Sequence, residues 1–291
     1  LMAFFSNDSE PGISPAGKLL VVVPGFPGCA QLYTEFLRDL ALASSCTIVG
    51  VSWCGQHEDP AEMSATQPTP GLEAQVAFLA TVFRELRALE DVSAIHVMGQ
   101  SMGAWMVSQA IAQIDAEDLQ RHAEGKASMR SLPEMLGVHL VCPILEDMSL
   151  IPRSKTFRPI IDVLLRSRMS HLPMLIALVL PLEVTTFCFQ FLWWLRGKTT
   201  LSSEDAHLWR CLAAHLRMGM VHRAACLAEQ AFLRIGPAEA WLASLRQRGT
   251  GVHLHFAIGD GWTPQALQAH FSQRDYLPLA KQVQHRMPHG V

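Results

Sequence analysis

Residues 94–111 read AIHVMGQSMGAWMVSQAI and join three segments of different character. The first five residues form a short β-rich run, and the last eight carry apolar side chains at helical spacing. Between them lies GQSMG, residues 99–103, a G-x-S-x-G motif. Strand, motif and helix in this order predict a nucleophile elbow, a sharp turn that exposes the hydroxyl of Ser101. Gly99 and Gly103 suit such a turn because side chains there would collide with the neighbouring strand and helix. The alternative is an ordinary glycine-rich turn that carries a serine.

The rest of the chain alternates strand-like and helix-like segments. Apolar runs predict strands at 18–23, 46–51, 138–143 and 251–258, with a short strand at 281–283. Helical periods occupy 31–43, 72–89 and 264–271, and the polar stretch 115–133 is expected to be a loop or a helix extension. This alternation predicts an α/β-hydrolase fold, a mostly parallel sheet with flanking helices.

A long helical block interrupts this alternation. We therefore divide the chain into a first core part at 1–149, a helical and apolar cap at 150–236 and a second core part at 237–291. Because the chain starts with Leu1 and ends two residues after His289, we expect the second core part to be truncated.

One segment of this block, from Leu172 to Leu195, reads LPMLIALVLPLEVTTFCFQFLWWL. Glu183 is its only charge, and Pro181 breaks it near the middle. Basic residues flank both ends, which predicts a hairpin that dips into a lipid surface. The alternatives are a buried pair of cap helices and a full membrane span.

Composition narrows the function. The 291 residues are 49% hydrophobic and 17% charged, with a net charge of −3. Without a basic run interleaved with aromatic residues, nucleic-acid binding is not expected. The seven scattered cysteines are typical of reduced thiols. His253 and His255 alternate on a predicted strand, but no further ligand lies near them in sequence, so we expect neither a metal site nor a cofactor.

A serine hydroxyl needs a base, and the base needs an orienting acid. In α/β hydrolases the order along the chain is serine, acid, histidine. Asp260 directly follows the strand at 251–258 and is our predicted acid, with Glu146 and Asp147 as alternatives. His289, between a proline and a glycine near the end of the chain, is the predicted base, and His285 is the alternative.

The oxyanion hole needs two backbone N–H donors. Met102 follows the nucleophile and supplies one of them. The loop PGFPG at 24–28 should supply the other through Phe26, since Pro27 has no N–H. Gly25 and Gly28 allow this backbone to approach the substrate closely. The alternative is an ordinary Pro-Gly turn.

Four stretches together carry a family resemblance: PGFPG at 24–28, GQSMGA at 99–104, PILEDM at 143–148, and DGWTP at 260–264 with MPH at 287–289. The chain resembles the lipid droplet-associated serine hydrolase family, with Phe26 where that family usually has Asn and Gln100 where it has His. The resemblance implies a triad of Ser101, Asp260 and His289. It also implies an ester hydrolase on the cytosolic face of lipid droplets or endoplasmic reticulum, with sterol esters as a substrate class.

The sequence thus predicts a serine ester hydrolase of lipid esters that works through an acyl-enzyme. Its expected partners are the lipid ester and a lipid-droplet or endoplasmic-reticulum surface, contacted by the segment from Leu172 to Leu195. One alternative is a lipid-droplet protein that keeps the fold with little or no activity. Another is a thioesterase or peptidase with the same triad, because acyl specificity depends on pocket shape.

Overall fold

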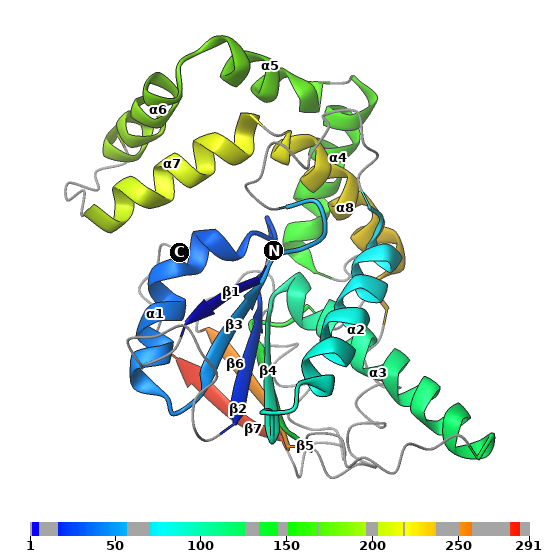
Figure 1. The fold of residues 1–291 in the computed structure, drawn as a ribbon. Coiled ribbons are helices and arrows are strands. Elements are labelled where there is room, and N and C mark those ends of the chain that lie inside the picture. Colours follow the sequence, from blue (N-terminus) through cyan, green and yellow to red (C-terminus); the bar gives the residue numbers. More distant parts are fainter. Residues whose placement is uncertain are drawn as a thin grey trace.

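The computed structural model describes residues 2–5, 17–56, 70–125, 134–144, 151–167, 169–195, 203–217, 219–236, 251–257 and 280–285. Within these residues, seven strands form one sheet of order β1-β3-β2-β4-β5-β6-β7 (Figure 1). The strands are β1 (Met2–Phe5), β2 (Lys18–Val23), β3 (Thr47–Val51), β4 (Ala94–Gln100), β5 (Glu134–Val141), β6 (Gly251–Ala257) and β7 (Ala280–His285). β1 is antiparallel to β3, and every other neighbouring pair is parallel. The expected mostly parallel sheet is confirmed.

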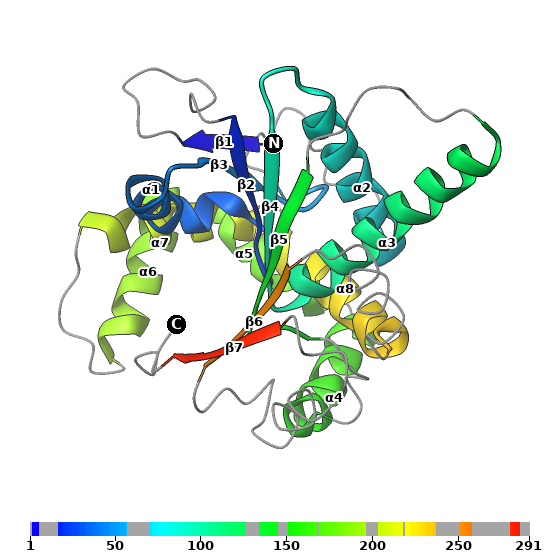
Figure 2. The same cartoon turned by 90° about the horizontal axis from the view of Figure 1, so that it is seen from below.

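Helices cover both faces of this sheet (Figure 2). α1 (Thr34–Ala43), entered through the 3₁₀ turn η1 (Ala30–Tyr33), packs on one face, where Leu20 and Val22 contact Leu37. α2 (Leu72–Ala88) and α3 (Met102–Ala123) pack on the other face, against the alternate strand residues such as Val21 and Val97. The continuous apolar run of β2 is explained by this arrangement, because both of its faces are buried.

Several boundaries differ from the expected ones. The polar stretch that starts at 115 begins inside α3, where Arg84 and Arg87 of α2 form ion pairs with Glu117 and Asp118 at 2.9 and 3.3 Å. β5 starts four residues earlier than expected, β7 is longer, and the edge strand β1 was not predicted. The helix expected at 264–271 lies outside the described residues.

Between β5 and β6 the described chain is helical. It contains α4 (Pro152–Arg166), the 3₁₀ turn η3 (Met169–His171), α5 (Leu172–Val179), α6 (Leu182–Leu195), α7 (Ser203–Arg217) and α8 (Met220–Arg234), which we call the insertion. α8 packs against α2 and α4, while α5 and α6 pack against α7. Figure 1 shows α5, α6 and α7 on the side of the sheet where β2 and β4 end.

The oily segment of the insertion is not one continuous helix, because α5 ends before Pro181 and α6 begins after it. In the part of the chain that the structure describes, we find no helix with both the length and the apolar character needed to cross a membrane.

Candidate active site

Ser101 occupies the turn between β4 and α3 in a strained conformation. Its φ of 51° lies in the left-handed region, which non-glycine residues rarely adopt. A Cβ on Gly99 would come within 2.7 Å of Cα of Ala104, and a Cβ on Gly103 within 2.4 Å of the Pro24 carbonyl oxygen. The turn therefore has the geometry of a nucleophile elbow, and both glycines are needed for the steric reason expected from the sequence.

Backbone hydrogen bonds fix this elbow against the end of β5. Ser101 donates its N–H to the carbonyl of Val141 at 2.9 Å, and its own carbonyl accepts from Ile144 at 3.3 Å. Cys142, just beyond β5, also has a positive φ, 44°, and donates to His255 of β6 at 2.7 Å. Strained backbone of this kind clusters at functional sites, and here two such residues lie at neighbouring strand ends.

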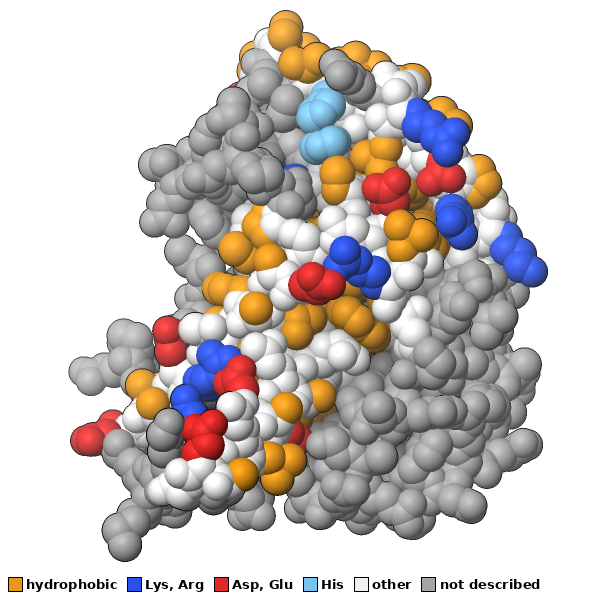
Figure 3. Space-filling model, turned by 90° about the vertical axis from the view of Figure 1, so that its right-hand side faces the viewer, with side chains coloured by type: hydrophobic (Ala, Val, Ile, Leu, Met, Phe, Trp, Pro, Cys, Tyr) orange, Lys and Arg blue, Asp and Glu red, His pale blue; other side chains and the backbone are white. Residues whose placement is uncertain are grey.

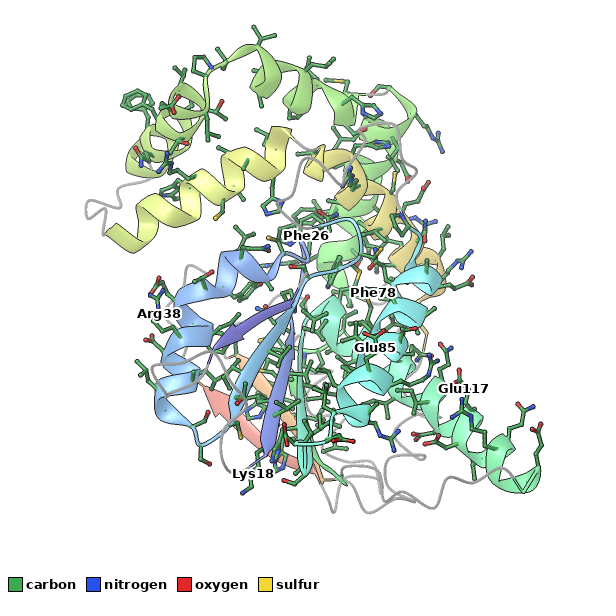
Figure 4. All side chains as sticks on the ribbon, in the orientation of Figure 1. Lys18, Phe26, Arg38, Phe78, Glu85 and Glu117 are labelled. Carbon is green, nitrogen blue, oxygen red and sulfur yellow. The ribbon has the colours of Figure 1, made fainter. Side chains whose placement is uncertain are left out.

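The loop 24–28 lies directly against the nucleophile. A Cβ on Gly25 would come within 2.9 Å of Cβ of Ser101. The loop closes through a bond from Gly28 N–H to the Gly25 carbonyl, 2.7 Å, and Trp53 donates its ring N–H to the Pro24 carbonyl at 2.9 Å. The side chain of Phe26 is about half exposed at the carboxyl edge of the sheet, below the insertion (Figure 4).

Gln100 ties the elbow to this loop, a role that the sequence did not reveal. Its side-chain oxygen accepts the Gly25 N–H at 3.3 Å, so this N–H points to the elbow. Tyr33, the last residue of η1, comes five residues after this loop. Burial, together with the nearby Cys29, raises the pKa of Tyr33 to about 12, so that its hydroxyl stays protonated at neutral pH.

The N–H groups of Phe26 and Met102 remain the predicted oxyanion donors. Met102 is the first residue of α3, where a backbone N–H has no intrahelical acceptor. A helix N-terminus also carries partial positive charge that favours an anion. The described geometry thus brings together Ser101 and the two segments expected to hold an oxyanion.

The structure does not describe the side chains of the other predicted catalytic residues. Asp260, Glu146, Asp147 and His289 lie outside the described residues, and His285 ends β7 with a side chain that is not described. The choice of acid and base therefore stays a prediction. β6, which precedes Asp260 in sequence, pairs in parallel with β5, so it ends at the same sheet edge as the elbow.

Four histidines gather on the α1-facing side of the sheet, two more than the sequence pattern suggested. His139 of β5 stacks on His253 at a centroid distance of 4.6 Å, and its Nδ1 is 3.3 Å from Nε2 of His255. His96 lies 6.0 Å from His139, between ring centroids. Burial and the three neighbouring imidazoles lower the pKa of His139 to about 4. Among the described residues, no group of three or more His, Cys, Asp or Glu is arranged to hold a metal ion.

Comparison with solved structures identifies the class of fold. The chain is similar to an α/β hydrolase from a Medee basin deep-sea metagenome library, with a TM-score of 0.56, 11% identity, and coverage of 98% of this chain and 85% of the other. It is similar to a structure from a study of Nitrososphaera gargenis carboxylesterases, with a TM-score of 0.55, 13% identity, and coverage of 97% and 89%. It is also similar to an esterase of Exiguobacterium antarcticum, with a TM-score of 0.53, 12% identity, and coverage of 97% of this chain and 86% of the other. The fold is therefore that of the α/β hydrolases.

The family follows from the sequence itself. Residues 16–290 match the model of the lipid-droplet associated hydrolases, and the chain belongs to this family. No curated protein sequence matches the chain. The family match and the similarity to solved α/β hydrolases confirm the expected family resemblance and the hydrolase class.

Proposed function

We propose that this protein is a serine hydrolase of lipid esters, sterol esters among them, which works at the surface of lipid droplets or endoplasmic reticulum, on the cytosolic face. The observation that carries the proposal is Ser101 in a strained elbow, with the loop 24–28 against its Cβ. A left-handed serine costs stability, of the order of 1–3 kcal/mol, and such a cost is typical of residues whose geometry serves function.

In the proposed reaction, Oγ of Ser101 attacks the acyl carbonyl carbon while His289 accepts the hydroxyl proton. Asp260 orients the imidazole, and the N–H groups of Phe26 and Met102 stabilise the oxyanion. Collapse of the resulting tetrahedral intermediate releases the alcohol, which takes the proton from His289. An acyl group stays on Ser101. Water, activated by the same histidine, then releases the carboxylic acid and restores the serine.

The test of the nucleophile is Ser101→Ala, compared with Ser108→Ala. Ser108 lies in the same helix, fully buried, with its hydroxyl bonded to the Ala104 carbonyl at 2.6 Å. We expect Ser101→Ala to lose fluorophosphonate labelling and about 10³–10⁶-fold of ester turnover, whereas Ser108→Ala keeps both. Absence of labelling in the folded parent would instead support a non-catalytic lipid-droplet protein.

The acid and base are separated by paired variants. Asp260→Asn should lower kcat by about 10⁴-fold, as expected when the imidazole loses its orienting carboxylate, while Glu146→Gln and Asp147→Asn should not. His289→Ala should be as inactive as Ser101→Ala, and His285→Ala should stay active. The reverse pattern in either pair would reassign that role.

Attachment to lipid is proposed from an inverted burial pattern in α6. This helix buries Thr185 and Thr186, with exposed fractions of 5% and 8%, and exposes Phe187 and Phe191 at 63% and 46%. The threonine hydroxyls bond back to the carbonyls of Pro181 and Leu182 at 3.2 and 2.8 Å. A helix that faced only water would bury its phenylalanines, so an apolar medium outside α6 explains the pattern.

The neighbouring helices extend this apolar surface. Further exposed apolar side chains on α4 and α5 include Phe157, Ile160, Val163, Leu172, Leu175, Ile176 and Val179. Figure 3 shows hydrophobic side chains along the top of the molecule, where Figure 1 has α5. Exposed apolar side chains of this kind suit insertion into the boundary of a phospholipid monolayer.

Flotation with phospholipid-coated triolein droplets tests the attachment. Phe187→Asp with Val179→Asp should reduce droplet binding at least tenfold, because each side chain would contribute about 1.5–3 kcal/mol by leaving water. Leu119→Asp is the matched control, because Leu119 is 68% exposed but lies on α3, away from the insertion. Equal binding of the double variant and this control would contradict the proposal.

A further inference from the structure

A buried contact between a cysteine and a histidine joins the insertion to the core beside the active site. Sγ of Cys29 lies 2.7 Å from Nε2 of His215, and each residue is only 1% exposed. Cys29 directly follows the loop 24–28, and His215 is on α7, which contacts η1 just beyond that loop. The two residues are 186 positions apart in sequence.

The end of the loop is also held from the core side. Sγ of Cys29 is 2.9 Å from the side-chain oxygen of Gln31, which in turn accepts a bond from the Ser52 hydroxyl at 3.1 Å. The next residue along, Ala30, donates its N–H to the same hydroxyl at 2.9 Å. The thiol therefore sits between a fixed core network and a histidine of the insertion.

The other end of the loop 24–28 is held by the elbow. Cys29 follows the loop directly, and Gln100 beside Ser101 accepts the Gly25 N–H of the same loop at 3.3 Å. On the other side of the insertion, α7 packs against α5 and α6, which carry the exposed apolar residues. α7 thus lies between the proposed lipid-binding helices and the loop with the Phe26 N–H.

We propose that His215 is a positioning residue: through Cys29 it holds the loop 24–28 in the conformation that stabilises the oxyanion, so that the position of α7 controls turnover. This inference rests on the proposed serine hydrolase activity. A small displacement of an oxyanion donor lowers kcat more than substrate binding, since the oxyanion exists only in the transition state and the tetrahedral intermediate. A contact that only stabilised the fold would not produce this separation of kcat from KM.

Two near-isosteric substitutions test whether the side chain at position 215 must reach Cys29 or need only be polar. In His215→Gln the terminal amide takes the place of Nε2 and reaches Cys29, whereas in His215→Asn the amide ends at the place of Nδ1. On a soluble short-chain ester, we expect kcat of His215→Asn to be about tenfold below that of His215→Gln, with KM changed by less than about twofold. His215→Ala and Cys29→Ala should each lose about tenfold in kcat, and the double variant should lose no more than either one.

The control is Arg234→Ala, which removes the exposed ion pair between Arg234 of α8 and Glu73 of α2. This ion pair also joins the insertion to the core, but it is distant from the loop. It should keep the parental kcat. Melting temperatures of all variants identify any that fail to fold, and the Asn and Gln pair then carries the comparison. Equal kcat in these two folded variants, or additive losses in the double variant, would overturn the proposal. A parent without fluorophosphonate labelling or turnover would instead refute the hydrolase function, and the inference with it.

Discussion

Replacing Gly103 with alanine is the sharpest test of how the elbow and the loop fit together. The new Cβ would lie 2.4 Å from the Pro24 carbonyl oxygen and 2.7 Å from that of Val23, both backbone atoms. Real Cβ atoms essentially never approach closer than 3.0 Å, so the end of β2 would have to move by more than half an ångström. Overpacking of this kind costs about 1–3 kcal/mol of stability.

The larger effect is expected on catalysis. The displaced carbonyls lead directly into the loop 24–28, which carries the predicted oxyanion donor Phe26. Loss of an oxyanion donor lowers kcat by about 10²–10³-fold, and a misplacement near 1 Å can cost about 10²-fold. We therefore expect a folded Gly103→Ala protein with kcat reduced about 10²-fold or more and with slower fluorophosphonate labelling of Ser101.

The assay compares hydrolysis of p-nitrophenyl butyrate with thermal unfolding of the same samples. Gly236→Ala is the matched control, because nothing lies within 4 Å of the Cβ that it would add. The control should keep parental activity and stability. If Gly103→Ala folded and turned over substrate within about threefold of the parent, the loop would not depend on this contact and our reasoning would fail.

Two further predictions concern Gln100 and the histidine cluster. Gln100→Ala removes the acceptor of the Gly25 N–H and should lower kcat about tenfold in steady-state kinetics. Gln120 is exposed, so Gln120→Ala should leave kcat unchanged. Equal kinetics of the two variants would contradict the role of Gln100. For His139, the pKa of about 4 in the folded protein lies below the ordinary histidine value of 6.5, so between these pH values the unfolded chain binds a proton that the folded protein excludes. The free energy of unfolding should therefore fall as pH falls through this window. Urea titrations at pH 7 and pH 5 should show a smaller loss of unfolding free energy for His139→Phe than for the parent. An equal loss would exclude His139 as the source of the pH dependence.

Sequence patterns sufficed where the determining residues are neighbours in the chain. The parallel strands β2 and β4 and the elbow at Ser101 are predictable because their apolar runs and flanking glycines are local. The edge strand β1 was missed because four residues that pair antiparallel with β3 carry little periodicity of their own. The polar end of α3 stayed ambiguous because it has no apolar period, and its ion pairs to α2 join residues that are distant in the sequence.

The supporting contacts of the site could not be predicted, because they join distant parts of the chain. Gln100 and Gly25 are 75 positions apart, and His139 and His255 are 116 apart. No spacing rule links such pairs, and a glutamine in the elbow motif gives no indication that it would bind the loop. The triad assignments to Asp260 and His289 are in a different position, since they depend on chain order in related hydrolases and stay predictions.

The left-handed conformation of Ser101 makes thermal stability and catalytic activity conflicting requirements at this position. Glycine accepts a positive φ without steric cost, so Ser101→Gly should melt at a higher temperature than the parent while losing its reactive oxygen. A library sorted for thermal tolerance alone would enrich this dead variant. Engineering programmes that aim at a sturdier enzyme should therefore select for survival and ester cleavage together.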